Sequence, residues 1–118
     1  MRLEIRQRGM KVTNELRVHV RERLRLALGR FARSIAQVWV YLRDVNGPRG
    51  SLSKICRIVV ELPRRGRVVV TGKDSDVYAA ITRTANRAKF AVRRHVKQRL
   101  ARRRPSRRPA NDVPVAVI

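Results

Sequence analysis

The chain has 118 residues, of which 30 are Lys or Arg and only eight are Asp or Glu, so its formal net charge is +22 and its isoelectric point is near 12.0. This length allows one domain with a modest core, and the single cysteine, Cys56, excludes an internal disulfide. No run of roughly 18 apolar residues occurs and the first residues lack an apolar signal core, so we expect neither a membrane span nor a secretory signal. A charge this large favours a polyanionic partner, of which nucleic acid is the commonest.

The first elements in chain order are a strand and a long helix. Leu3 and Ile5 alternate with charged residues, as in a strand with one buried face. Thr13 is the expected N-cap, and Glu15 in the first turn complements the helix dipole. An apolar stripe at steps of three and four residues then predicts a helix over about 14–34. The stripe consists of Leu16, Val20, Leu24, Ala27, Leu28, Phe31 and Ile35.

Three strands joined by turns are expected next. Apolar residues alternate with aromatic or charged ones over 38–43, and the segments 54–62 and 67–71 are rich in β-branched residues. Asn-Gly-Pro at 46–48 and the segment from Pro to Gly at 63–66 carry the residue types of turns. The short connections predict that these three strands form an antiparallel meander.

A second helix is expected to start within 74–76 and to run to about Arg103. Two prolines then stop it, and we expect residues 105–118 to form a disordered basic and apolar tail. The alternative for the apolar end at 113–118 is a docking segment. The apolar face of the helix consists of Val77, Ile81, Ala85, Ala88, Val92 and Val96.

The order β-α-β-β-β-α defines the expected fold. The long first connection contains a helix, so the first two strands can be parallel with a right-handed crossover. We therefore predict an α+β domain over 1–104, in which a four-stranded sheet carries both helices on one face. The other face is open, and the alternation assigns to it Arg2, Glu4, Arg6, Trp39, Tyr41, Arg43, Arg57, Val59, Arg67 and Val69.

Two groups of basic residues are the candidate contacts to nucleic acid. Ten Lys or Arg lie between Arg83 and Arg104 without one Asp or Glu, whereas an ordinary solvated face mixes both signs. We predict that ridges on the two helices form a positive groove that follows RNA phosphates, which positions a protein without reading sequence. The alternative is a charged face that serves solubility alone. The assigned residues are Arg17, Arg21, Arg25, Arg83, Arg87, Arg94 and Lys97.

Aromatic residues on the open sheet face indicate a second surface, because bases stack on exposed aromatic rings flanked by Arg. The alternative is an aromatic patch covered by the tail or by a second copy of the chain, and we favour it because the helices carry more charge. We expect a monomer, with a homodimer through the open face as the other arrangement. The residues of this surface are Trp39, Tyr41, Arg43 and Arg57.

Catalysis, cofactors and metals are not expected. The acidic residues are scattered, and the chain has no phosphate loop, dinucleotide fingerprint or nucleophile elbow. His19 and His95 have no Cys or His at ligand spacing, which argues against a metal site. Cys56 lies inside an apolar strand and is expected to be a core residue rather than a nucleophile. We therefore expect neither an enzyme nor a small-molecule substrate.

Three motifs follow one another along the chain. They are T-x-x-L-R-x-x-V at 13–20, I-x-x-V-x-V-x-L at 35–42 and D-x-Y-x-A-I at 76–81. Together with Arg23, Leu24 and Phe31, and with Arg87, Arg94 and His95 in a basic helix, they resemble the bacterial ribosome hibernation-promoting factor and ribosome-associated inhibitor family. The resemblance covers roughly residues 2–104. The chain departs from the family at 87–92, where it reads RAKFAV in place of a usual K-L-x-x-Q-L run.

The resemblance implies a cytoplasmic, RNA-binding stress-response protein. Its partner would be the rRNA of the small ribosomal subunit, in the channel where messenger and transfer RNAs bind, and it would block translation there. The chain is similar to the short members of the family, which stop after one domain. Two other readings are a structured-RNA-binding module without ribosome specificity and an adaptor that docks on acidic proteins through the same arginines. No membrane partner is expected.

Overall fold

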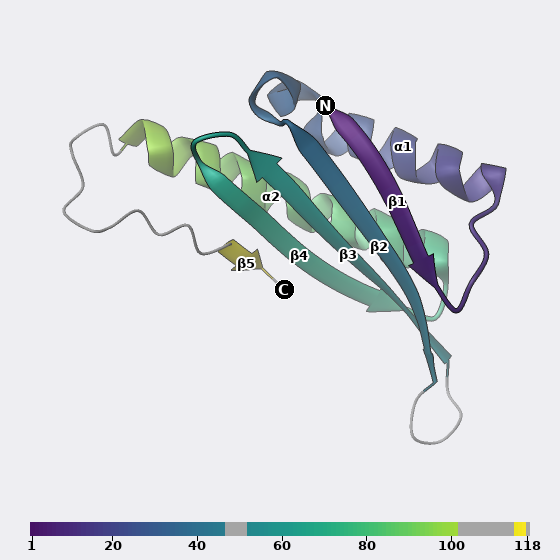
Figure 1. Ribbon diagram of the computed structural model, residues 1–118. Helices are drawn as coiled ribbons and strands as arrows, with labels where there is room; N and C mark the ends of the chain where they lie inside the picture. The colour runs from purple at the N-terminus through teal and green to yellow at the C-terminus, as the bar shows by residue number, and fades with distance from the viewer. Residues whose placement is uncertain (47–51, 102–114, 118) are drawn as a thin grey trace.

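The computed structural model describes residues 1–46, 52–101 and 115–117 (Figure 1). Two helices lie on one face of a mixed sheet, in the predicted α+β order β-α-β-β-β-α, so the expected fold is confirmed. The elements are β1 (Arg2–Arg8), α1 (Asn14–Leu28), the 3-10 helix η1 (Gly29–Ser34), β2 (Gln37–Asn46), β3 (Leu52–Leu62), β4 (Gly66–Asp74), α2 (Val77–Ala101) and β5 (Val115–Val117).

The strands lie in the sheet in the order β1-β2-β3-β4-β5, which is also their order in the chain. β1 pairs with β2 in parallel, because α1 makes the crossover between them. β2 with β3 and β3 with β4 are antiparallel hairpins, as the meander prediction required. Both helices lie behind the sheet in Figure 1, so the face toward the viewer is free of helices.

The core lies between the sheet and the two helices. Every second residue of β2, β3 and β4 points into it, and α1 and α2 add their apolar stripes. Burial of one Leu or Ile side chain stabilises the fold by about 1.5–3 kcal/mol relative to exposure. The largest fully buried side chains include Leu24, Leu28, Leu42, Ile58, Leu62 and Ile81.

The first helix begins where the sequence predicts and ends earlier. The hydroxyl oxygen of Thr13 accepts a hydrogen bond from the backbone N–H of Leu16 at 3.1 Å, which confirms the N-cap. The prediction placed the helical end near residue 34, but α1 ends at Leu28 and the chain continues as the tighter η1. Gly29 explains the difference, because glycine is a poor helix former. The last residues of the predicted apolar stripe still face the core, since Phe31 is half-buried and Ile35 is buried.

The second helix packs on β3 and β4 and starts on two aspartates. The Asp76 carboxylate accepts a hydrogen bond from the N–H of Tyr78 at 3.0 Å, and the Asp74 carboxylate accepts one from the N–H of Asp76 at 3.0 Å. These bonds satisfy N–H groups that a helix start leaves without partners. The predicted end of this helix, at Arg103, lies outside the described residues. The predicted turn at 47–48 lies outside them as well.

A fifth strand forms within the predicted tail. Val115–Val117 pairs in parallel with β4, and Ala116 lies opposite Val69. For these three residues the structure differs from the expected disorder. They pair because the edge of β4 presents unpaired backbone groups and valine favours an extended backbone. The alternative reading of a docking segment describes them better. Residues 105–114 and Ile118 lie outside the described residues, so the tail prediction is untested there.

Candidate nucleic-acid interfaces

A small polar cluster joins α1 to α2. The Nε2 atom of His19 lies 3.2 Å from the backbone oxygen of Tyr78 and 3.3 Å from the hydroxyl of Thr82, and the His19 and Tyr78 rings meet edge to face at 4.8 Å. One turn further along, Arg23 donates a hydrogen bond from Nε to the same Thr82 hydroxyl at 3.2 Å. His19 and Arg23 therefore mark the side of α1 that faces α2.

The three predicted arginines of α1 lie on its other side. An α-helix turns by about 100° per residue, so a residue two positions from His19 or Arg23 points about 200° away. Arg17, Arg21 and Arg25 meet this condition, and all three are exposed. Arg25 is 2.6 Å from Glu22, and this hydrogen bond and charge lower the pKa of Glu22 and raise the pKa of Arg25.

Arg83 and Arg87 point toward β4. Arg87 is half-buried and donates a hydrogen bond from its guanidinium to the backbone oxygen of Thr71 at 2.6 Å. Arg83 donates one to the backbone oxygen of Lys73 at 3.4 Å, and its guanidinium lies 3.3 Å from the carboxylate of Asp74. These two predicted site residues are thus engaged in holding α2 on the sheet.

Arg94 and Lys97 extend the same helix beyond this anchored part. Arg94 is seven residues after Arg87 and therefore lies on nearly the same flank, two turns along the helix. Both Arg94 and Lys97 are exposed, and within the described part of the chain neither has an ion pair. Among the predicted residues of α2, these two present their charge most fully to solvent.

The two basic ridges do not share a groove, and that part of the prediction is wrong. The α1 ridge lies on the side of α1 away from α2, whereas Arg83 and Arg87 contact β4, on the side of α2 away from α1, and Arg94 shares their flank by helical spacing. The sequence shows which faces of a helix are apolar but not which face meets the neighbouring helix. Contacts such as that between His19 and Tyr78 decide this, and they join residues far apart in the chain.

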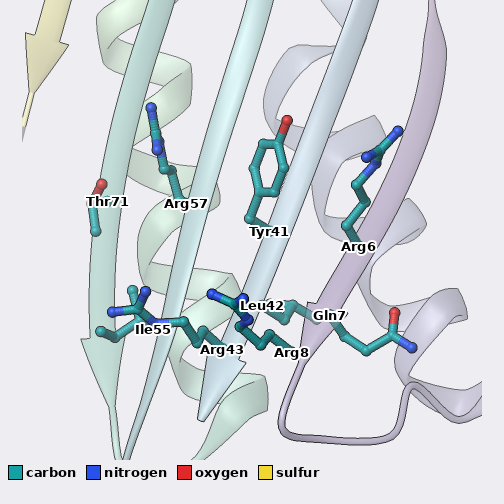
Figure 2. A pocket seen from close by; sticks show the side chains of 9 residues that line it. All are labelled: Arg6, Gln7, Arg8, Tyr41, Leu42, Arg43, Ile55, Arg57 and Thr71. Carbon is teal, nitrogen blue, oxygen red and sulfur yellow. The ribbon is translucent and has the colours of Figure 1, made fainter. Parts of the chain in front are cut away.

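The open face of the sheet brings together the predicted aromatic and basic residues. Figure 2 shows Arg6, Tyr41, Arg57 and Thr71 side by side on four neighbouring strands, in agreement with the pairing register. Four such rows cross the face: Arg2, Gln37, Glu61 and Arg67; Glu4, Trp39, Val59 and Val69; Arg6, Tyr41, Arg57 and Thr71; Arg8, Arg43, Ile55 and Lys73.

Each aromatic ring of this face has an arginine beside it. The guanidinium carbon of Arg57 lies 5.9 Å from the centre of the Tyr41 ring, and that of Arg67 lies 5.9 Å from the centre of the Trp39 ring. Two hollows of about 460 and 480 Å³ adjoin the rings and share Arg6, Tyr41 and Arg57 in their lining. The alternation in the sequence puts Arg6 and Arg67 on this face beside the aromatics, although neither is among the predicted site residues.

The remaining candidate residues have structural roles. Cys56 is buried, and burial raises the pKa of its thiol to about 12. His19 and His95 each contact a backbone oxygen, of Tyr78 and Arg65 respectively. Within 1–46, 52–101 and 115–117, no three His, Cys, Asp or Glu residues gather as a metal site. No helix of these ranges is both long and apolar enough to cross a membrane.

Comparison with known families settles the relationship that the motifs indicated. Residues 3–100 match the model of the family described as "Sigma 54 modulation protein / S30EA ribosomal protein". The chain belongs to this family. The resemblance drawn from the motifs is thereby confirmed, and the chain is a member of a family of ribosome-associated factors.

Solved structures agree with membership of the S30EA family. The N-terminal domain of Protein Y from Thermus thermophilus is 28% identical, with a TM-score of 0.62 over 80% of this chain and 98% of that one. A ribosomal subunit interface protein from Coxiella burnetii has a TM-score of 0.69 over 82% of this chain and 99% of that one; at 16% identity it shows the fold alone. No curated protein sequence matches the chain.

Proposed function

We propose that this protein is a hibernation factor that occupies the channel for messenger and transfer RNA on the small ribosomal subunit. The observation that carries the proposal is its membership of the S30EA family over residues 3–100. A protein in that channel inhibits translation by steric occlusion and needs no catalytic group. Its action would take place in the cytoplasm, as part of a stress response.

Basic residues on two opposite sides of the pair of helices suit a protein that binds between two segments of rRNA. Arg17 and Arg21 lie on one side of the two helices, and Arg94, which shares the flank of Arg87, lies on the other side. Each flank can contact phosphates of a different rRNA segment, whereas a single groove would follow only one. Such contacts fix position without reading bases. The fold itself then fills the space between the two segments.

Arg25, Arg83 and Arg87 support this contact less directly. Arg25 shares its charge with Glu22, Arg83 lies beside Asp74, and Arg87 donates to a β4 carbonyl. An arginine already engaged inside the protein has fewer donors left for a phosphate. We therefore expect the exposed residues Arg17, Arg21, Arg94 and Lys97 to contribute more to rRNA binding than these three residues.

The test is sedimentation of the purified full chain with isolated small subunits at about physiological salt. The variant Arg21→Glu/Arg94→Glu reverses one charge on each flank. The control Lys11→Glu/Arg33→Glu makes the same change in net charge at two exposed residues that belong neither to the two basic ridges nor to the open sheet face. We expect the flank variant to leave the subunit peak and the control to stay in it. Equal loss of both variants would contradict the proposal, since net charge alone would then explain binding.

A structured-RNA-binding module without ribosome specificity is the second candidate, and the net charge of +22 favours it. Excess unrelated structured RNA in the same sedimentation experiment separates the two functions. A channel-binding factor remains on the subunit in this competitor and is displaced by bound messenger and initiator transfer RNA. A general RNA binder transfers to the competitor.

A further inference from the structure

The face of the sheet opposite the helices has the composition of a binding surface of its own. Tyr41 is 37% exposed in the middle of this face, and Trp39 lies two residues before it on the same strand. We propose that this face binds single-stranded RNA, with bases stacked on Trp39 and Tyr41 and phosphates held by the arginines around them. The proposal goes beyond the channel-blocking function, which uses the helical flanks.

The spacing of the two rings fits successive bases of an extended strand. Residues two apart in a strand point to the same face and lie about 7 Å from each other. The guanidinium carbons of Arg57 and Arg67 lie over the Tyr41 and Trp39 rings, 5.9 Å from the ring centres, so a cation is close to each stacking position. The hollows of about 460 and 480 Å³ leave room over the rings for planar groups. Other four-stranded sheets bind RNA by stacking two or three bases on aromatics of the same kind.

The charge of the face selects a polyanion over a second copy of the chain. Of the 16 residues in its four rows, seven are Arg or Lys and two are Glu, and Glu4 is paired with Arg6 at 2.5 Å. Two such faces would repel each other on contact. The sequence of 102–114 has the same sign of charge, with five Arg and one Asp.

Single-stranded RNA suits this surface better than a duplex. The bases of a duplex are paired and stacked on one another, so they cannot lie on a protein ring, whereas unpaired bases can be splayed onto it. The phosphates of an extended strand can reach Arg6 and Arg43, which lie in neighbouring rows of the face. Stacking is also tolerant of sequence, so we expect little base preference.

Trp39 reports on this site directly because it is the only tryptophan of the chain. The experiment titrates the full-length protein with an unstructured RNA of about ten nucleotides at about physiological salt, and follows tryptophan fluorescence. We expect saturable quenching, since a stacked base contacts the indole. The same strand annealed to its complement should quench far less.

Two variants test the assignment by anisotropy of a labelled RNA. Tyr41→Val keeps a strand-forming residue and should weaken single-strand binding about tenfold, the effect of losing one stacked base. Arg57→Gln should also weaken it. The matched control Arg33→Gln removes one charge from an exposed position of η1, outside both candidate RNA surfaces, and should leave the affinity unchanged.

Three results would overturn the proposal. They are equal quenching by duplex RNA or by inorganic polyphosphate, an unchanged affinity in Tyr41→Val, and a concentration-dependent dimer in sedimentation velocity that Tyr41→Val disperses. The ribosome function is measured separately, because Tyr41→Val should still sediment with small subunits. Loss of single-strand binding with subunit binding intact supports this second site. Single-strand binding and subunit binding that are both unchanged in Tyr41→Val contradict it without touching the proposed function.

Discussion

The guanidinium of Arg87 donates a hydrogen bond to the backbone oxygen of Thr71 at 2.6 Å, and this bond ties the middle of α2 to β4. The sequence presents Arg87 as one of a row of similar basic residues on a helix. The structure separates it from Arg94, which has the same charge on nearly the same flank but is exposed. The two arginines therefore have different roles.

Replacement of these two arginines by alanine should affect stability differently. Arg87→Ala removes a hydrogen bond from a charged donor and part of the cover over β4, so we expect the free energy of unfolding to fall by about 1–2 kcal/mol. Arg94→Ala should change it by about 0.5 kcal/mol or less. Urea denaturation of both variants gives the comparison. Similar losses would show that the bond to Thr71 has no net effect on stability.

Gly72 and Thr84 form a close contact between β4 and α2. A Cβ atom added to Gly72 would lie 2.4 Å from the hydroxyl oxygen of Thr84, which is fully buried and donates a hydrogen bond to the Ala80 carbonyl at 2.6 Å. We expect Gly72→Ala to destabilise the fold by about 1–3 kcal/mol through overpacking.

The double variant Gly72→Ala/Thr84→Ala should be more stable than the sum of the two single changes allows. Thr84→Ala alone should cost about 1 kcal/mol, since it removes a buried hydroxyl with its hydrogen bond. In the double variant the loss of the Thr84 hydroxyl also removes the clash with the new Cβ atom at position 72. Urea denaturation of the four proteins forms a double-mutant cycle. Additive effects would mean that the backbone shifts to accommodate the methyl group.

The elements of this fold could be predicted from the sequence because its apolar residues keep regular periods. The two-residue period of β2 to β4 predicts which side chains face the helices, so Trp39 and Tyr41 were placed on the open face from alternation alone. The boundaries of the elements were predicted less well. Gly29 ends α1 six residues before the predicted end, and Val115–Val117 joins the sheet because the edge of β4 is free to pair with this segment.

The candidate site was predicted only in part because it depends on contacts between distant residues. Helical spacing groups Arg83, Arg87 and Arg94 on one flank, and the first two contact backbone oxygens of β4. It does not show that Arg87 binds the Thr71 carbonyl or that His19 meets Tyr78. These tertiary contacts separate the two ridges and divide the anchored arginines from the exposed ones.

The start of α2 should depend on pH through Asp74. The hydrogen bond from the N–H of Asp76, followed by the charge of Arg83, lowers the pKa of Asp74 in the folded protein. A lowered carboxyl pKa contributes stability above the unfolded value of about 3.9, and this contribution is lost as the pH falls toward the folded pKa.

The variant Asp74→Asn isolates this charge, because an amide oxygen can still accept the bond from Asp76. We expect the variant to be less stable than the parent chain at pH 6–7 and the difference to shrink below about pH 4. Urea midpoints measured across this range test it. A difference that stays constant to pH 3 would show that the carboxylate charge contributes nothing.

Cys56 should be unreactive while the protein is folded. It is buried in β3, and burial raises the pKa of its thiol to about 12, so the reactive thiolate is scarce. Relative to an exposed cysteine near 8.5, its modification by a thiol reagent at pH 8 should be slower by roughly a thousandfold or more. The same chain unfolded in urea is the control and should react at the rate of an exposed thiol. Fast reaction of the folded protein would show that β3 opens locally.

The salt dependence of small-subunit binding should separate arginines that contact phosphate from those that hold the fold. Binding through phosphate contacts releases counterions, so the logarithm of the binding constant falls linearly with the logarithm of salt concentration. Each contact removed should reduce the slope by about one. Arg21→Gln/Arg94→Gln should therefore reduce it by about two, whereas Arg87→Gln should reduce it by much less because its guanidinium is engaged with Thr71. If Arg87→Gln reduced the salt slope by as much per residue as the double variant, Arg87 would itself contact RNA phosphate.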